Sequence, residues 1–457
     1  MSKKKKPPQT ASQKLKKRVS ACCGAAARRF KSGTETAGKA LSSAGTAVYG
    51  NVSRFLQYKF SAVLLTVFFL LLMALTTLLM GRSILYKTFP LAFPISFPFY
   101  LIDYSVGFVS RALVGQIVAF FTDSVSVNML LVLTRTVTIL SLAVRAGLAA
   151  VTFKRAFLNR SPLICLLCVY FAVSPITVMC YQIYLGFLDP YNMMLTVLYL
   201  FVSNKKAAYI LTPLICFTGI VLHYQFILSF LPLILSVELY YICMEKQGRG
   251  LRIASLTATV LGSAALTVYL MFYSKYNTRM DADALYTYMC NKFTDFSTWG
   301  LFEEYFTYYI YGDFEGMNYS NPLDFVKFLV TYSLERTSTY SLVGYAVGIA
   351  PVVCFTEYLW GRMAIRAKGA QKLPYLVFML QPLLLAGSVI AITDNGRSFG
   401  ASIFSMFSLL YITCRREDPL IYETAKKAEK PAFLLLCAAA MAIGYALSFS
   451  RINHMFI

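Results

Sequence analysis

The chain is dominated by apolar stretches of about twenty residues that carry few charges and do not alternate polar with apolar positions. The first is SAVLLTVFFLLLMALTTLLM, residues 61–80. A helix of about 20 residues crosses the hydrocarbon core of a bilayer, whereas the strands of a membrane β-barrel alternate residue by residue. Only 14% of the residues are charged, against about 25% in soluble domains. We therefore predict an all-α fold, a polytopic integral membrane helical bundle.

Clusters of Lys and Arg divide these stretches into crossings and set their direction. Clusters at 205–206 and 246–252 enclose one mostly apolar stretch, and two clusters on the same side require an even number of crossings between them. The only polar break in that stretch is His223-Tyr224-Gln225, where we expect an exterior hairpin turn. The same rule predicts a cytoplasmic N-terminus, an exterior C-terminus and about eleven crossings. They are expected near residues 61–80, 126–149, 162–182, 187–203, 207–243 (two crossings), 254–273, 339–360, 374–393, 398–414 and 431–449.

Residues 1–60 form a basic tail, which we separate from a transmembrane domain at 61–457. The tail holds fourteen Lys and Arg residues against one acidic residue, Glu35, within a net charge of +22. Because it directly precedes a predicted crossing, anionic lipid headgroups are the expected partner rather than nucleic acid. We interpret the tail as a largely disordered cytoplasmic topology signal.

The first exterior segment, 81–125, is predicted to contain an interfacial helix. Pro90, Pro94 and Pro98 prevent a regular helix at its start. The apolar stretch GFVSRALVGQIVAFF, which comes after Asp103, has about fifteen residues and is too short to cross a bilayer. If 103–115 is helical, Asp103 and Arg111 share one face with Gly107 and Gly115. Asp103 is then a candidate base or metal ligand, and Arg111 a candidate phosphate-binding residue. The alternative is an interfacial helix with a capping Asp and a snorkelling Arg.

Further candidates fall at the same predicted face of the membrane. His223 lies at the hairpin tip and is a candidate general base or phosphate contact, or else a hydrogen-bonded interface histidine. Asp394 and Arg397 flank an Asn-Gly turn, and Arg397 could bind phosphate or pyrophosphate. Asp189 precedes a proline, so a helix N-cap is the simpler interpretation beside a secondary site role.

Two arginines fall within the second predicted crossing. Arg135 lies about nine residues into it, near the midplane, where a charge normally faces a bundle interior or a cavity. It is a candidate contact for an acidic residue or a lipid phosphate. Arg145 lies closer to the cytoplasmic end, and we expect it to snorkel toward the headgroups.

The exterior segment 274–338 is the one long polar loop, with nine acidic and five basic residues among many aromatics. Aromatic rings beside carboxylates suit a carbohydrate site, but a Trp and Tyr belt at the membrane interface gives the same pattern. The eleven cysteines lie mostly within apolar stretches and form no disulfide framework. No Walker motif, zinc motif or nucleophile elbow is present in the sequence.

The arrangement resembles the GT-C superfamily of membrane glycosyltransferases and the related envelope polysaccharide polymerases and ligases. The shared features are many crossings, an interfacial helix with Asp in the first exterior loop, and a long late exterior loop across residues 61–449. The resemblance implies a sugar donor carried on polyprenyl phosphate, with Asp103 activating the acceptor or binding a metal. It also implies that Arg111, Arg397 and His223 bind the lipid pyrophosphate. Tyr104 follows Asp103 where many GT-C enzymes have a second acidic residue, so a divalent cation (Mg or Mn) is left open.

We therefore expect a membrane glycosyltransferase or polysaccharide polymerase in a bacterial cytoplasmic membrane. It would act at the exterior face on a polyprenyl-phosphate-linked sugar and a glycan acceptor. The alternatives are a transporter or lipid flippase, and a non-enzymatic membrane scaffold that binds through its long loop. The enzyme interpretation requires that Asp103, Arg111, His223 and Arg397 meet in space, within about 15 Å of one another, the length of roughly ten helical residues.

Overall fold

The computed structural model describes residues 49–79, 97–109, 111–178, 186–245, 247–270, 280, 282–295, 339–382 and 395–454. The chain divides into two units, Met1–Ser61 and Ala62–Ile457. In the first unit, residues 49–57 form a helix. In the described part of the second unit the regular elements are helices, and two residues that are distant in the sequence, Val125 and Phe293, form an isolated β-bridge. The expectation of an all-helical chain is therefore confirmed for the described residues.

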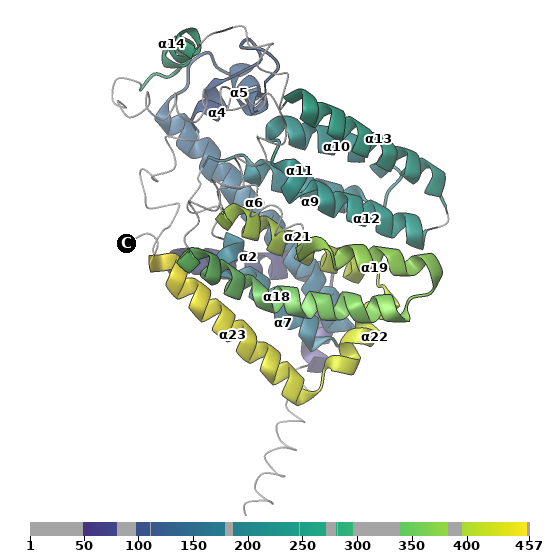
Figure 1. The fold of residues 1–457 in the computed structure, drawn as a ribbon. Coiled ribbons are helices and arrows are strands. Elements are labelled where there is room, and N and C mark those ends of the chain that lie inside the picture. Colours follow the sequence, from purple (N-terminus) through teal and green to yellow (C-terminus); the bar gives the residue numbers. More distant parts are fainter. Residues whose placement is uncertain are drawn as a thin grey trace, which may run out of the picture. The chain divides into compact units, whose positions relative to one another are not determined.

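The elements of the second unit are shown in Figure 1. The first of them, α2, begins at Ser61, which is the last residue of the first unit. They are α2 (Ser61–Leu79), α4 (Pro98–Leu101), α5 (Ala112–Ala119), α6 (Val127–Leu158), α7 (Pro162–Val173), α9 (Asp189–Val202), α10 (Ala208–Leu222), α11 (Phe226–Ser229), α12 (Leu231–Met244), α13 (Arg249–Val268), α14 (Ala282–Lys292), α18 (Thr339–Arg366), η5 (Gly369–Gln371), α19 (Lys372–Phe378), α21 (Asn395–Arg415), α22 (Pro419–Ala428) and α23 (Pro431–His454).

Five of the described helices are long and apolar enough to cross a membrane: Ser61–Leu79, Val127–Leu158, Arg249–Val268, Leu342–Arg366 and Pro431–Phe449. These agree with five of the predicted crossings, and the chain has the character of a helical membrane protein. Other predicted crossings correspond to shorter helices, among them α7, α10 and α12. The full number of eleven stays a prediction.

The segment after Asp103 differs from the expected single helix over 103–115. The helix α4 ends at Leu101, residues 102–109 form a looped connection, and α5 begins only at Ala112. Gly107 has φ of 130° and Arg111 has φ of 70°, and neither value fits a right-handed helix. The Asp103 carboxylate accepts the Ser105 N–H at 2.8 Å, a local bond that competes with helix formation. The predicted shared face of Asp103 and Arg111 is therefore wrong.

The loop packs closely on α5 because a glycine leaves room for it. A Cβ built at Gly115 would lie 1.9 Å from the carbonyl oxygen of Ile102. The Gln116 side chain accepts the Tyr104 N–H at 3.0 Å from the same helix. These two contacts hold the loop 102–109 against α5.

The hairpin turn predicted at His223 is confirmed. The helix α10 ends at Leu222, His223 has extended backbone angles, and the chain resumes in α11 and α12. Gly219 lets the ring of Phe226 pack against α10, since a Cβ there would lie 2.5 Å from that ring. The helices α10 and α13 lie side by side (Figure 1).

The expectation that Arg145 snorkels is also wrong. The residue is 1% exposed and lies well inside α6, where its guanidinium donates to the carbonyl oxygen of Thr177. Thr134, Thr138 and Ser141 precede it at helical spacing and are all buried. Their hydroxyls donate to backbone carbonyls of α6 itself, so α6 presents a polar face to the interior of the unit.

Candidate functional site

Four of the predicted site residues converge in the second unit, although each comes from a different element. Arg111 precedes α5, Asp189 is the first residue of α9, His223 follows α10, and Arg397 lies in the first turn of α21. We call them the Arg–His cluster. His223 is 4% exposed and Arg397 is 8% exposed, while Arg111 and Asp189 are half-buried.

Arg397 is the centre of the cluster. Its Nη2 lies 2.7 Å from Asp189 Oδ2 and 3.3 Å from His223 Nε2. Its guanidinium also lies over the ring of Phe187, 4.6 Å from the centroid. Asp189 was expected to cap α9, but Leu188 occupies the N-cap and the carboxylate of Asp189 pairs with Arg397 instead. A cap needs only local sequence, whereas this ion pair requires α21 to lie beside the start of α9.

The imidazole of His223 faces N–H donors at both ring nitrogens. The Gln225 N–H donates to Nδ1 at 3.1 Å, and Nε2 faces the Arg397 guanidinium. Burial lowers the pKa of His223 well below its usual range, and the positive charges of Arg111 and Arg397 lower it further. The ring is therefore neutral at pH 7, with one proton. If Nδ1 accepts from Gln225, that proton lies on Nε2, and a ligand oxygen beside Nε2 and the Arg397 guanidinium, within hydrogen-bond reach of each, would accept from both.

Arg111 is held in a strained backbone conformation beside two aromatic rings. Its φ of 70° is in the left-handed region, which costs a non-glycine residue roughly 1–2 kcal/mol. Its backbone N–H donates to the carbonyl of Val221 at 3.1 Å, which ties it to the end of α10. The guanidinium lies 5.1 Å from the ring centroid of Phe99 and 5.4 Å from that of Tyr224. Such strain concentrates at functional sites because the surrounding contacts must maintain it.

The charges of the Arg–His cluster favour an anionic ligand. Two guanidinium groups, one carboxylate and a neutral imidazole leave one net positive charge. The positive ends of α9 and α21 lie at the same place, since Asp189 and Arg397 are in their first turns. Planar guanidinium groups with several N–H donors match the oxygens of phosphate.

Of the four residues expected to meet, Arg111, His223 and Arg397 lie in the Arg–His cluster, whereas the described contacts of Asp103 are with Ser105, Tyr288 and Lys292. We call Asp103 and these three partners the Asp103 cluster. Asp103 Oδ2 accepts the hydroxyl of Tyr288 at 2.6 Å and forms an ion pair with Lys292, and both partners lie on α14. Burial of the carboxyl would raise its pKa, but the hydrogen bonds from Lys292, Ser105 and Tyr288 outweigh burial and lower the pKa to about 2. A carboxylate with so low a pKa is a weak base at neutral pH.

Two further residues were predicted as site members, Arg135 and Asp394. Arg135 lies in α6 and is half-buried. Asp394 lies outside the described residues, as does most of the long loop 274–338. Within the described parts of the chain, no three His, Cys, Asp or Glu side chains are grouped so that they could hold a metal ion. The divalent cation therefore stays an open prediction.

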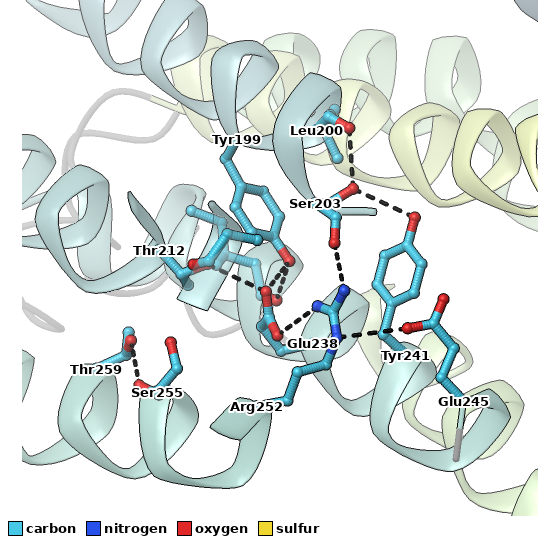
Figure 2. A network of polar contacts seen from close by, with 12 residues as sticks. Tyr199, Leu200, Ser203, Thr212, Glu238, Tyr241, Glu245, Arg252, Ser255 and Thr259 are labelled. Atoms are coloured by element: carbon cyan, nitrogen blue, oxygen red, sulfur yellow. Dashed lines mark hydrogen bonds and ion pairs between the residues drawn. The ribbon is translucent and has the colours of Figure 1, made fainter. Parts of the chain in front are cut away.

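Figure 2 shows a buried polar network that was not predicted from the sequence. Glu238 of α12 and Arg252 of α13 form an ion pair of 3.0 Å, with side chains 1% and 2% exposed. Glu238 Oε1 also accepts the hydroxyls of Tyr199 and Thr212, and Arg252 donates to the carbonyl of Ser203 at 2.6 Å. The only sequence signal was a single acidic residue within an apolar stretch. In the sequence, Arg252 belongs to the basic cluster 246–252, which marks a cytoplasmic boundary.

Asp418 is the centre of a neighbouring polar group. Its Oδ2 accepts the hydroxyl of Tyr375 at 2.6 Å and that of Tyr240 at 2.8 Å, and its Oδ1 accepts the Leu420 N–H at 3.0 Å. These bonds connect the start of α22 to α12 and α19. Both this group and the Glu238–Arg252 pair lie among basic segments predicted to be cytoplasmic, so we interpret them as structural rather than as a reaction site.

Comparison of the chain with protein-family models, with curated proteins and with solved structures found no match in any of the three.

Proposed function

We propose that this chain is a membrane glycosyltransferase or polysaccharide polymerase that uses a polyprenyl-phosphate-linked sugar. The Arg–His cluster would hold the phosphate or diphosphate of the donor, through the guanidinium groups of Arg111 and Arg397 and the Nε2–H of His223. The observation that carries the proposal is the convergence of these three side chains, from separate elements, on one largely buried place. The chemistry needs such donors because the leaving phosphate gains negative charge in the transition state.

The lengths of the helices that carry the cluster support a lipid-linked ligand. The helices α9 and α10 have 14 and 15 residues, so they rise only about 21–23 Å from the basic residues at 205–206. A hydrocarbon core is roughly 30 Å thick. Asp189 and His223 would then lie below the exterior surface of the membrane, at a depth that suits a headgroup whose tail stays in the bilayer.

In the proposed transfer, the bond between the anomeric carbon of the sugar and the phosphate oxygen breaks. Its electron pair goes to the phosphate, where Arg111, Arg397 and His223 meet the added charge. The hydroxyl oxygen of the glycan acceptor forms the new bond to the anomeric carbon, and its proton goes to a carboxylate. Asp189 is the carboxylate we propose, because a phosphate that binds Arg397 would free it from its ion pair. Asp103, with its pKa of about 2, is less suited to accept the proton.

The location and partners belong to the same proposal. The chain would reside in a bacterial cytoplasmic membrane with the Arg–His cluster toward the exterior and the basic tail against anionic lipid headgroups. Both the donor and the glycan acceptor would reach the cluster from the exterior half of the bilayer. A divalent cation (Mg or Mn) would be tested by adding a chelator to the transfer reaction.

The test uses cells of the source organism that lack this chain and have a measurable surface glycan. They would be complemented with the wild-type chain, Arg397→Ala, His223→Gln, or the control Arg155→Ala. Arg155 is not a member of the Arg–His cluster and forms an exposed ion pair with Glu417. We expect the wild type and the control to restore the glycan, and the two cluster variants to fail at equal membrane abundance. A wild-type amount of surface glycan in cells with either cluster variant would contradict the proposal if both variants give it.

A further inference from the structure

The Asp103 cluster links α14 to the loop 102–109. Lys292 Nζ pairs with Asp103 Oδ2 and also donates to the carbonyl of Leu101 at 3.4 Å. The Tyr288 hydroxyl donates to the same carboxylate and accepts from the Ser105 hydroxyl at 3.0 Å. Lys292 and Tyr288 are four residues apart, so one face of α14 presents both groups to Asp103.

Two backbone contacts fasten the end of α14 to the start of α6. The Val125 N–H donates to the carbonyl of Lys292 at 2.8 Å, and the Thr294 N–H donates to the carbonyl of Val125 at 3.0 Å. The Asp295 carboxylate accepts the Val127 N–H at 2.8 Å, where α6 begins. The connection therefore does not depend on the Asp103 ion pair alone.

An apolar face of α14 completes the contact. Leu285, Met289 and Phe293 follow one another at intervals of four residues and are 1%, 0% and 2% exposed. The ring of Phe293 lies 5.4 Å from that of Phe97, centroid to centroid. In Figure 1, α14 lies beside α4.

The segment that α14 fastens leads directly to Arg111. Asp103 begins the loop 102–109, whose other contacts are with Gly115 and Gln116 of α5. Arg111 immediately precedes α5 and needs this support, since its own backbone conformation is strained. Movement of the loop would therefore displace the guanidinium of Arg111 from the Arg–His cluster.

We propose that α14 is a brace for the Arg–His cluster, and that Asp103 is a positioning residue rather than a proton acceptor. Its carboxylate receives the Ser105 N–H, the Tyr288 hydroxyl and the Lys292 ammonium, and a transferred proton would break this arrangement. The proposal that α14 is a brace depends only on the contacts that α14 makes. The positioning role rests additionally on the function proposed for Arg111.

The first experiment tests the brace without assuming any activity. Hydrogen–deuterium exchange would be measured on the full-length chain in lipid nanodiscs, at the amides of residues 103–109. We expect Lys292→Met and Asp103→Asn to accelerate exchange about tenfold, which corresponds to a loss of about 1.4 kcal/mol. Tyr288→Phe removes two hydrogen bonds, the one to Asp103 and the one from Ser105, but leaves the ion pair between Lys292 and Asp103. It should have a smaller effect, and it covers the case in which a stronger variant fails to fold. Lys427→Met, at an exposed position of α22, is the control. Unchanged exchange in all three α14–Asp103 variants would overturn the brace.

The second experiment tests the positioning role by measuring affinity for two probes, inorganic pyrophosphate and a polyprenyl phosphate in nanodiscs. Asp103→Asn and Lys292→Met should weaken binding of the probe to a similar extent, and the double variant should weaken it no further. The exchanged pair, Asp103→Lys with Lys292→Asp, should restore part of the affinity. Tighter binding of the polyprenyl phosphate would identify a lipid headgroup, and equal binding a free phosphate group.

The outcomes separate the two proposals. If the wild-type chain binds neither probe, the proposed function fails and the positioning role fails with it, while hydrogen exchange still decides on the brace. If the wild type binds a probe and Asp103→Asn binds it equally well, the positioning role is wrong and the proposed function survives. A base would show that second pattern, because removing a proton acceptor slows transfer without weakening the binding of phosphate.

Discussion

Arg397 and Asp189, which begin two different helices, form an ion pair with 2.7 Å between Nη2 and Oδ2. Their side chains are 8% and 13% exposed, so the pair is largely removed from water. The same guanidinium nitrogen faces His223 at 3.3 Å. Any anion that binds Arg397 must therefore compete with a carboxylate already in contact, and this competition can be measured.

The substitution Asp189→Asn should remove the carboxylate charge that competes with an anion for Arg397. We expect the free energy of unfolding to fall by about 3 kcal/mol, as for other largely buried pairs that lose one partner. Added pyrophosphate should raise the melting temperature of this variant more than that of the wild type. Thermal unfolding in detergent measures both effects, with the exposed Asp283→Asn as the control. Equal stabilisation of the variant and the wild type by pyrophosphate would contradict an anion site at Arg397.

The contact between the loop 102–109 and α5 predicts that Gly115 tolerates no side chain. A Cβ there would lie 1.9 Å from a backbone oxygen, so Gly115→Ala must shift the loop and should cost about 1–3 kcal/mol or more. Gly147 of α6 has nothing within 4 Å of its Cβ position, and Gly147→Ala should be neutral or stabilising by up to about 1 kcal/mol. Comparison of the two melting temperatures checks the prediction, which fails if the two variants are equally stable.

The buried and exposed ion pairs should differ in their contribution to stability. Glu238→Gln removes the nearer of the two carboxylates that pair with the buried Arg252 guanidinium and leaves Glu245 at 3.6 Å, and we expect a loss of about 3 kcal/mol. Glu417→Gln breaks the pair with Arg155, whose side chains are 44% and 56% exposed, and should cost about 0–1 kcal/mol. Chemical denaturation of both variants under identical conditions gives the comparison. Similar losses would mean that the Glu238–Arg252 pair is not closed to water.

The lowered pKa of His223 predicts a loss of stability in mild acid. Burial and two neighbouring arginines keep the ring neutral in the folded chain, while the unfolded chain binds a proton below a pKa of about 6.5. Acid therefore favours the unfolded chain, by at most about 1.4 kcal/mol for each pH unit below 6.5. The melting temperature of the wild type should fall between pH 7.5 and pH 5.5 more than that of His223→Gln. An identical fall in the two proteins would show that His223 does not have a lowered pKa.

From the sequence alone, the positions of many helices and of the turn at His223 could be predicted. Apolar stretches without charges have no alternative to helices in a bilayer, because backbone groups there must bond within their own segment. Parity of the basic clusters located the turn at His223, and the structure confirms it. The same topology argument predicts that Arg111, Asp189 and Arg397 lie at helix ends on one side of the membrane. For that reason their convergence could be expected from the sequence.

Which of these residues contact one another could not be predicted from the sequence and depends on how the helices pack. Asp103 and Arg111 are close in the sequence and were expected on one helical face, yet a left-handed residue and a loop turn them toward different partners. Lys292 reaches Asp103, and Glu238 reaches Arg252, through helix contacts that local sequence patterns do not specify. Local sequence determines the periodicity and the ends of each helix, whereas the packing of distant helices determines which charge faces which. For that reason the sequence could place the candidate residues at one end of the helices, but only the fold separated the Arg–His cluster from the Asp103 cluster.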